Sequence, residues 1–294
     1  MSNIPNTSLY PPLVEYHDSL TIEELKNLAL QIRRDVIDIA EHSGTRSGHL
    51  GGEMSVADIL AVLYGSFVRL DPNNPHWEGR DIVILSKGHN SAAQYAALAF
   101  RGVLDRKLLF NDMNKADCIL QEHSNTDIPG IEAPTGSLGM GLAAGAGFAW
   151  AFKQQNKNNK VYVILGDGEC TEGQVWEAAL FANAHGLDNL IAIVDYNKYI
   201  ITGNIEETMR MEPMAGKWSA FGWDTVSVDG HSVEELKGSL ERAVENKESP
   251  GKPKMIVANT LKGYPISFMM DDPLTFHSAH LTDETYKRSM EELK

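Results

Sequence analysis

Two polar side chains stand where apolar, strand-like runs of the sequence end. Asp167 follows the run at residues 161–165, between Gly166 and Gly168, and Asn197 follows the run at residues 190–196. Their separation, 197 − 167 = 30 residues, is the length of one strand–helix–strand unit. In open parallel sheets ligands bind beyond the carboxyl ends of the strands, so we expect both side chains there, side by side. A carboxylate and an amide oxygen suit Mg²⁺ completed by water and phosphate oxygens, and the flanking glycines let a diphosphate approach the backbone.

Two other interpretations of Gly166-Asp167-Gly168 compete with a metal-bridged diphosphate. One is an ordinary turn after a strand, and the other is a dinucleotide-binding fingerprint. The segment continues as Glu169-Cys170-Thr171 without a third glycine, and Glu172 and Glu177 follow. Acidic residues beside a phosphate are unfavourable unless a metal or another positive charge intervenes. The pattern therefore favours a metal-bridged diphosphate over NAD.

The elements that would position these residues alternate between strands and helices. Further strand-like runs occupy residues 82–86, 224–228 and 254–260, with helical patterns between the runs. A capping box of Thr21 and Glu24 begins the first helix, whereas residues 46–52 are too rich in glycine for a helix. We predict an α/β fold, a mostly parallel sheet with helices on both faces. Residues 1–20 would form an N-terminal arm, and residues 21–294 a single domain without an internal linker.

Composition excludes several classes of protein. The chain has 294 residues, with 26 Lys and Arg against 40 Asp and Glu, so its net charge is −14. This acidic balance argues against nucleic-acid binding and against a polybasic membrane anchor. Cys118 and Cys170 lack the paired spacing of a zinc site. The first residues do not resemble a signal peptide and no apolar run is long enough to span a membrane, so we expect a cytoplasmic protein.

Several separate motifs resemble those of one enzyme family. Gly-Asp-Gly followed after 28 residues by Asn197 is similar to the thiamine-diphosphate-binding motif. SGHLGG, ILSKGH, TGSLGMGL and the block ANTLKGYPISFM, followed by Phe276-His277, resemble transketolase motifs, in the family's order, over residues 21–290. Because full-length transketolases continue into a pyrimidine-binding and a C-terminal domain, the chain resembles the N-terminal subunit of a split, two-gene transketolase.

The resemblance implies the thiamine-diphosphate-binding fold and a set of ligands for thiamine diphosphate and Mg²⁺. The metal ligands would be Asp167, Asn197 and the backbone carbonyl of Tyr199. The residues matching cofactor contacts are His89, Gly136, Ser137, Leu138, Gly168, Asn197, His277, Glu172 and Glu177. Of these, Glu172 and Glu177 match acids that link cofactor sites across a subunit interface.

The resemblance also implies that histidines handle protons during transfer of a two-carbon ketol unit from a ketose to an aldose. The C3 hydroxyl of the donor must lose a proton, and imidazole is the usual base near neutral pH. We expect His277 and His49 to share this proton transfer and His123 to orient the C1 hydroxyl. His280, three residues after His277, is the alternative match for it. His231, in VDGHS before a helix, is interpreted as part of a turn.

Two departures from the family concern the sugar. Leu50 follows His49, and Ser124 follows His123, where the family usually has proline. The ketose, phosphorylated in the simplest case, could therefore be an unusual sulfonated or branched sugar. We expect a dimer of heterodimers with a C-terminal subunit that carries the pyrimidine-binding domain, inactive without that partner. Part of another thiamine enzyme and a non-catalytic cofactor-binding module are the remaining alternatives.

Overall fold

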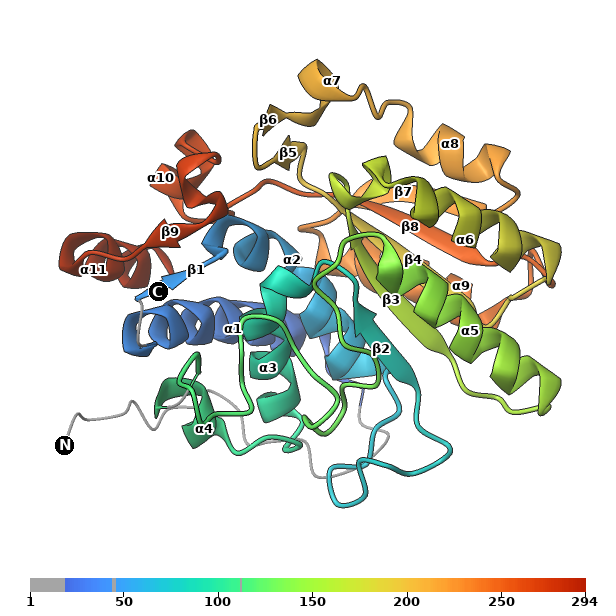
Figure 1. The fold of residues 1–294 in the computed structure, drawn as a ribbon, viewed down its shortest axis with the longest axis horizontal. Helices are drawn as coiled ribbons and strands as arrows, with labels where there is room; N and C mark the ends of the chain where they lie inside the picture. The colour runs from blue at the N-terminus through green and yellow to red at the C-terminus, as the bar shows by residue number, and fades with distance from the viewer. Residues whose placement is uncertain (1–18, 44–45, 112) are drawn as a thin grey trace.

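A computed structural model describes residues 19–43, 46–111 and 113–294. Its centre is a five-stranded sheet with the order β2-β3-β4-β8-β7, and every neighbouring pair is parallel (Figure 1). The strands are β2 (Ile82–Leu85), β3 (Val161–Gly166), β4 (Leu190–Tyr196), β7 (Asp224–Asp229) and β8 (Lys254–Asn259). The predicted α/β fold with a parallel sheet is therefore confirmed.

Helices cover both faces of the sheet, which explains why β2 and β3 are apolar and buried along their whole length. One layer contains α1 (Ile22–His42), α2 (Leu50–Val62), α3 (Ser91–Phe100) and α9 (Val233–Glu245). The other contains α5 (Met140–Gln154), α6 (Gly173–Ala184) and α8 (Met214–Ala220). Within β3, Tyr162 packs into the first layer and Val163 into the second, because successive side chains point to opposite faces.

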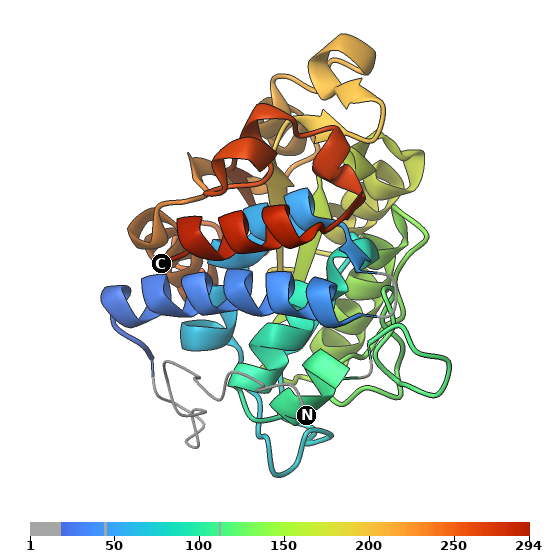
Figure 2. The same ribbon diagram turned by 90° about the vertical axis from the view of Figure 1, so that its left-hand side faces the viewer.

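Smaller elements complete the chain. Among the described residues the other α-helices are α4 (Arg106–Asn111), α7 (Ile205–Thr208), α10 (Ser267–Asp271) and α11 (Asp283–Glu292). Short strands form two antiparallel pairs, β1 (Ser47–Gly48) with β9 (Ala279–His280) and β5 (Tyr199–Ile200) with β6 (Gly203–Asn204). Figure 2 shows that α11, near the C-terminus, lies beside α1. Of the described helices, none combines the length and the apolar character needed to cross a membrane.

The beginning of α1 agrees with its sequence signal. The hydroxyl of Thr21 accepts a hydrogen bond from the amide of Glu24, and the carboxylate of Glu24 accepts one from the amide of Thr21 at 2.8 Å. These two bonds satisfy amides that a helix N-terminus leaves unpaired. The predicted capping box is thus present.

The glycine-rich segment at residues 46–52 differs from the prediction. Helix α2 begins at Leu50, so Gly51 and Gly52 are helical. A Cβ at Gly51 would lie 2.9 Å from the carbonyl oxygen of Phe276, and one at Gly52 would lie 2.9 Å from the side chain of Asn90. The glycines therefore allow close approach of other segments to this helix, and the tertiary packing outweighs their low helix propensity.

Candidate active site

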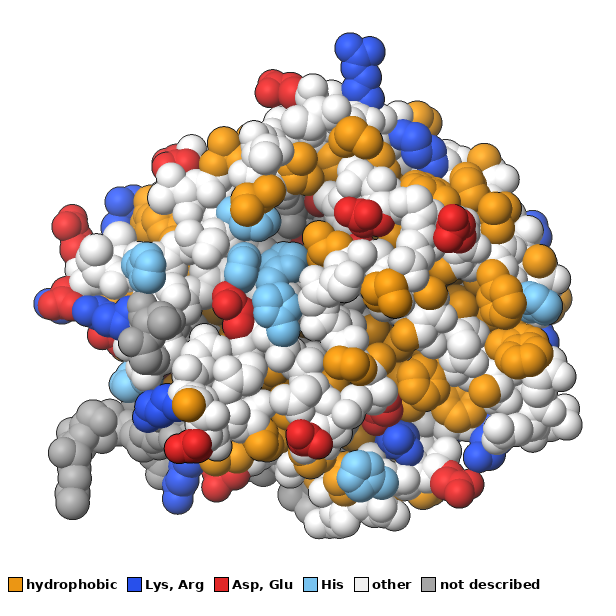
Figure 3. Space-filling view, viewed as in Figure 1, with side chains coloured by type: hydrophobic (Ala, Val, Ile, Leu, Met, Phe, Trp, Pro, Cys, Tyr) orange, Lys and Arg blue, Asp and Glu red, His pale blue; other side chains and the backbone are white. Residues whose placement is uncertain are grey.

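A cavity of about 400 Å³ opens at the carboxyl ends of β2, β3, β4 and β8. Figure 3 shows histidine side chains gathered at a hollow in the surface of this part of the molecule. The cavity is lined by His49, Gly52, Lys87, His89, Asn90, His123, Gly136, Leu138, Gly166, Asp167, Gly168, Glu169, Thr171, Glu172, Asn197, Tyr199, Ile200, Ile201, Lys262 and His277. The loops that follow four neighbouring strands thus meet in one site, as parallel sheets require.

Three histidines form a cluster in the cavity. The ring centroids of His49 and His89 are 4.8 Å apart, and that of His277 lies 5.5 Å from His49 and 5.8 Å from His89. Burial, followed by the charge of Lys87, lowers the pKa of His89 to about 2. Burial, followed by the charge of Lys262, lowers the pKa of His277 to about 4. Both imidazoles are therefore neutral near pH 7.

Two of the three predicted metal ligands, Asp167 and Asn197, directly follow the adjacent strands β3 and β4, and Tyr199 begins β5. Strands β3 and β4 pair so that Gly166 is opposite Asp195, which places Asp167 next to Asn197. The carboxylate of Asp167 accepts hydrogen bonds from the amides of Gly168 at 2.7 Å and Lys198 at 2.5 Å. Burial, followed by the charge of Asp195, raises the pKa of Asp167 to about 7. A cation beside this carboxylate would therefore stabilise its ionised form.

A positive group already lies beside one of these oxygen atoms, the backbone carbonyl of Tyr199. The Nζ of Lys262 donates to the carbonyl oxygen of Tyr199 at 3.2 Å and contacts Nδ1 of His277 at 2.7 Å. Burial lowers the pKa of Lys262 to about 8, against the opposing charge of Asp167, so its ammonium form dominates at neutral pH. The carbonyl oxygen of Tyr199 and the carboxylate of Asp167 therefore already face a positive charge.

Metal sites built from several carboxylates or histidines are absent from the described residues. Across the described ranges 19–43, 46–111 and 113–294, no three His, Cys, Asp or Glu side chains converge as metal ligands. The predicted set contains one carboxylate, one amide and one backbone carbonyl. Its donors are hard oxygens, which fit Mg²⁺ rather than zinc.

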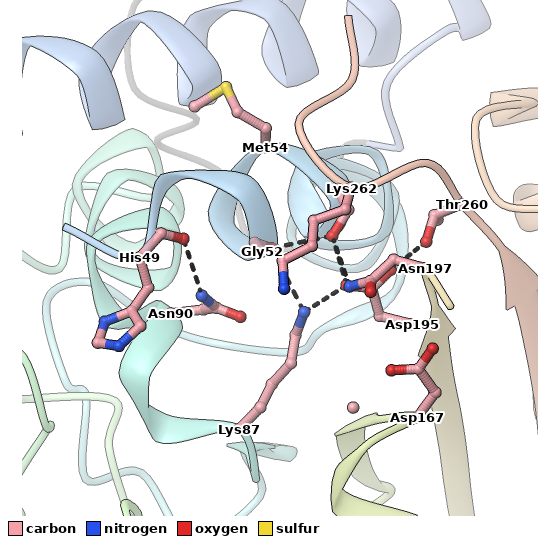
Figure 4. A network of polar contacts seen from close by, with 12 residues as sticks. His49, Gly52, Met54, Lys87, Asn90, Asp167, Asp195, Asn197, Thr260 and Lys262 are labelled. Carbon is pink, nitrogen blue, oxygen red and sulfur yellow. Dashed lines mark hydrogen bonds and ion pairs between the residues drawn. The ribbon is translucent and has the colours of Figure 1, made fainter. Parts of the chain in front are cut away.

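A buried ion pair that sequence reasoning missed forms the floor of the site (Figure 4). The ammonium of Lys87, after β2, contacts the carboxylate of Asp195 on β4. Asp195 also accepts hydrogen bonds from Ser55 at 2.6 Å and from Thr260. Burial is the largest influence and by itself would raise the pKa of Asp195, but the charge of Lys87 and the hydrogen bonds from Lys87, Ser55 and Thr260 together hold that pKa below its usual value. The signal was an aspartate inside the apolar run at residues 190–196.

A second missed carboxyl group, that of Glu169, connects the loops around the cavity. It accepts hydrogen bonds from Ser86 after β2, from the amide of Gly139 before α5 at 2.8 Å, and from the amide of Gly166 at 3.1 Å. Burial raises the pKa of Glu169. This residue therefore fixes the relative positions of three segments that line the site.

A third missed acid lies beside the histidine cluster. Oε1 of Glu122 is 2.7 Å from Nδ1 of His49, although the two atoms are not aligned as a hydrogen bond. This contact with His49 lowers the pKa of Glu122, so its carboxylate is ionised next to the imidazole.

The structure brings together most of the predicted site residues. Those that line the cavity are His49, His89, His123, Gly136, Leu138, Asp167, Gly168, Glu172, Asn197, Tyr199 and His277. Ser137 and Glu177 are not among the residues that line it. Of the two alternative histidines, His277 lines the cavity, whereas His280 is an exposed residue of β9. At Gly136, with φ of +145°, a Cβ would lie 2.7 Å from the ring of His123.

Comparison with known sequences gives a consistent result. The family model "Transketolase, thiamine diphosphate binding domain" matches residues 25–293. The chain is 44% identical to the 6-deoxy-6-sulfo-D-fructose transketolase subunit SqwG of Clostridium sp. strain MSTE9, over 84% of this chain and 88% of the relative. It is 34% identical to an apulose-4-phosphate transketolase subunit of Phocaeicola vulgatus, over 93% of this chain and 95% of the relative.

Solved structures agree with the sequence relatives. The transketolase from Campylobacter jejuni superposes with a TM-score of 0.84 at 31% identity and matches 93% of this chain. This chain covers only 43% of the Campylobacter enzyme's length, but most of the length of the Clostridium and Phocaeicola subunits. The predicted resemblance to the N-terminal subunit of a split transketolase is thereby confirmed, and the chain belongs to the transketolase family.

Proposed function

We propose that this chain binds thiamine diphosphate and Mg²⁺ and that, with a second subunit, it transfers a two-carbon ketol unit from a ketose to an aldose. The observation that carries the proposal is one cavity in which the oxygen atoms of Asp167, Asn197 and Tyr199 lie next to neutral histidines. The relatives named as transketolase subunits support the requirement for a partner.

The diphosphate would lie where the site concentrates hydrogen-bond donors and positive charge. Asp167, Asn197 and the carbonyl of Tyr199 would hold Mg²⁺, while Lys262 and His89 would face the phosphate oxygens. The charge of Lys87 is neutralised by Asp195, which leaves Lys262 to attract the anion. Gly168, Gly136, Ser137 and Leu138 would provide the backbone and apolar contacts, the last three beside the cofactor's rings.

Proton handling falls to this chain's own histidines. When bound, thiamine diphosphate supplies the nucleophilic carbon and the electron sink that carbon–carbon cleavage needs. We assign transfer of the proton of the donor's C3 hydroxyl to His277 and His49 jointly, because both line the cavity and their ring centroids lie 5.5 Å apart. His123, which also lines the cavity, would orient the C1 hydroxyl.

The sugar is expected to be an unusual ketose. The Clostridium and Phocaeicola subunits are named for 6-deoxy-6-sulfo-D-fructose and for apulose 4-phosphate, a sulfonated and a branched sugar. Leu50 begins α2 directly after His49, at a position where the family usually has proline. A different shape of the loop that carries His49 supports a donor other than the common phosphorylated ketoses.

The second subunit would complete each site at an interface. It would contribute the pyrimidine-binding domain, and the assembly would be a dimer of heterodimers. Glu172 lines the cavity and Glu177 projects from the exposed face of α6, so both could connect sites across that interface.

The test combines the purified chain with its second subunit, thiamine diphosphate and Mg²⁺. We expect ketol transfer from 6-deoxy-6-sulfo-D-fructose or apulose 4-phosphate by the pair, weaker transfer from fructose 6-phosphate, and none by the chain alone. Asp167→Ala should remove the Mg²⁺-dependent part of cofactor binding while leaving the chain folded, because it removes the one carboxylate among the metal ligands. Glu245→Ala, an exposed acid on α9, is the matched control.

Turnover by the chain alone would contradict the need for a partner. Equally tight Mg²⁺-dependent binding of thiamine diphosphate by the Asp167→Ala variant, measured by equilibrium dialysis, would contradict the metal site. Cofactor binding without ketol transfer by the pair would favour a non-catalytic module.

A further inference from the structure

His231 lies outside the cavity but makes two directed contacts with its ring. It follows β7 in the turn before α9, and its side chain is 10% exposed. Its Nδ1 is 2.8 Å from a carboxylate oxygen of Asp58 on α2, and its Nε2 is 2.9 Å from the backbone nitrogen of Leu261. The ring therefore bridges helix α2 and the segment that follows β8.

The donors and acceptors of this bridge can be assigned from the backbone. The amide of Leu261 can only donate, so Nε2 of His231 must be the acceptor. The hydrogen of the neutral ring is then on Nδ1, which donates to Asp58. Asp58 is ionised, because Arg33 and the bond from His231 outweigh the effect of burial and keep its pKa below the usual value. Both ring nitrogens of His231 are therefore used.

The bridged segment is the one that carries Lys262 into the cavity. The ring of His231 stacks on Tyr264, with centroids 3.8 Å apart and an interplanar angle of 22°. The carbonyl of Tyr264 accepts a hydrogen bond from Nε of Arg33 at 3.1 Å, and the amide of Gly263 donates to the carbonyl of Gly51 at 2.9 Å. Residues 261–264 are thus held against α1 and α2 on both sides of Lys262.

Within this segment the side chain of Lys262 has little conformational freedom. It is 4% exposed, and its Nζ contacts two acceptor atoms at the cavity, the Tyr199 carbonyl oxygen and Nδ1 of His277. A lysine side chain is long and flexible, so the position of its Nζ depends on the backbone from which it extends. The backbone on its N-terminal side is fixed by the hydrogen bond from Leu261 to His231.

We propose that His231 is a positioning residue that, through the amide of Leu261 and the ring of Tyr264, places the ammonium group of Lys262 for diphosphate binding. The ring itself does not line the cavity, and Asp58 with Arg33 holds it in the required tautomer. This role rests on the proposed function in so far as the ligand is a diphosphate. The contacts themselves belong to the chain alone.

The first test needs no ligand. His231→Phe keeps an aromatic ring to stack on Tyr264 but removes both hydrogen bonds, whereas His231→Gln keeps one donor and one acceptor. In the full chain we expect His231→Phe to speed hydrogen exchange at the Leu261 amide by about tenfold, which corresponds to about 1.4 kcal/mol. The same variant should speed acylation of Lys262 by an amine-reactive acylating reagent. His231→Gln should restore most of the protection, and melting temperatures would show that both variants fold.

The second test separates positioning from a general structural role. Binding of thiamine diphosphate with Mg²⁺ is compared in the parent chain, His231→Phe, Lys262→Met and the double variant. We expect His231→Phe to weaken binding by about tenfold when Lys262 is present and to have almost no effect when it is absent. A purely structural role would give the same loss in both backgrounds.

The outcomes are distinct for the two proposals. Equal exchange at Leu261 and equal labelling of Lys262 in His231→Phe and the parent would overturn the positioning role, as would additive losses in the double variant. If the parent chain bound no thiamine diphosphate, the proposed function would fail, while the exchange and labelling results would still decide whether His231 positions Lys262.

Discussion

At the scale of single residues, two carboxyl groups near the histidine cluster have opposite protonation behaviour. Glu53 and Glu122 both border a small cavity beside Ser47 and Gly48. Burial, followed by the charge of Glu122, raises the pKa of Glu53 to about 8, whereas the contact with His49 lowers the pKa of Glu122. At neutral pH, Glu53 is therefore mostly protonated and Glu122 is charged, so the two acids do not repel each other.

The buried state of Glu53 makes stability depend on pH. Its pKa is about 8 in the folded chain against a reference value of 4.5, so between these values the unfolded chain releases a proton that the folded chain keeps. Unfolding therefore becomes easier as the pH rises through this window. Glu53→Gln mimics the protonated acid and should remove this loss of stability. Its free energy of unfolding relative to the parent should therefore rise by about 2–4 kcal/mol from pH 5 to pH 8.5. Urea titrations at both pH values measure it.

The exposed Glu245→Gln serves as the control, with no pH-dependent gain expected. A difference between Glu53→Gln and the parent that stayed constant from pH 5 to pH 8.5 would show that Glu53 is ionised in the folded chain.

At the scale of elements, helix α5 approaches the sheet through its glycines. A Cβ at Gly145 would lie 2.4 Å from Cγ2 of Val163 on β3, whereas a Cβ at Gly147, on the same helix, would have no atom within 4 Å. Close contact between α5 and β3 keeps the glycine-rich turn before the helix next to Gly166 and Glu169. The glycines thus serve packing at one position and not at the other.

This contrast supplies a matched pair of substitutions. Gly145→Ala should destabilise the chain by about 1–3 kcal/mol, because the added methyl group forces α5 away from β3. Gly147→Ala should stabilise it by about 0.5–1 kcal/mol, because alanine favours the helix and finds open space. Chemical denaturation measures both. A stabilising Gly145→Ala would mean that the helix can shift without cost.

Local sequence signals predicted the helices and strands better than they predicted which of these elements contact one another. Apolar runs identified the strands, and the spacing of Asp167 and Asn197 correctly placed them on adjacent strands. The position of β8 between β4 and β7 depends on packing between distant segments, which no local pattern encodes. The start of α2 at Leu50 was missed for the same reason. Phe276 and Asn90, both distant in sequence, pack closely against Gly51 and Gly52, and this packing outweighs the low helix propensity of the glycines.

Site residues followed a similar division. The histidines and Asp167 were found because their motifs are distinctive, and the structure brings them to one cavity. Lys87, Asp195 and Lys262 were missed as a group, because a lysine and an aspartate in separate segments have no sequence signal for pairing. Only the fold shows that Asp195 neutralises Lys87 and leaves Lys262 facing the cavity.

At the scale of the whole molecule, an apolar surface extends from the cavity along α5 and α6. Figure 3 shows many hydrophobic side chains on this side of the molecule. Leu138 lines the cavity, and Met140, Trp150, Leu180 and Phe181 are each more than 40% exposed on these helices. Burying an apolar surface is more favourable than leaving it in water, and this one adjoins the cavity. It therefore fits the interface with the proposed second subunit.

Disrupting this surface should weaken assembly without affecting the fold. Leu180 is 57% exposed, so Leu180→Glu places a charge in the proposed interface and should weaken association with the second subunit by at least about tenfold. Met209→Glu, at a residue 55% exposed next to α7, is the control. Sedimentation of the mixed subunits gives both dissociation constants, and equal values for the two variants would place the interface elsewhere.

The hollow at the carboxyl ends of the strands also bears on the order in which the cofactor and the second subunit bind. In the lone chain Lys262 and the oxygen atoms of Asp167, Asn197 and Tyr199 already line a cavity that reaches the surface. A diphosphate can therefore enter before a second subunit covers the opening. Cofactor loading would then not have to wait for the two subunits to associate.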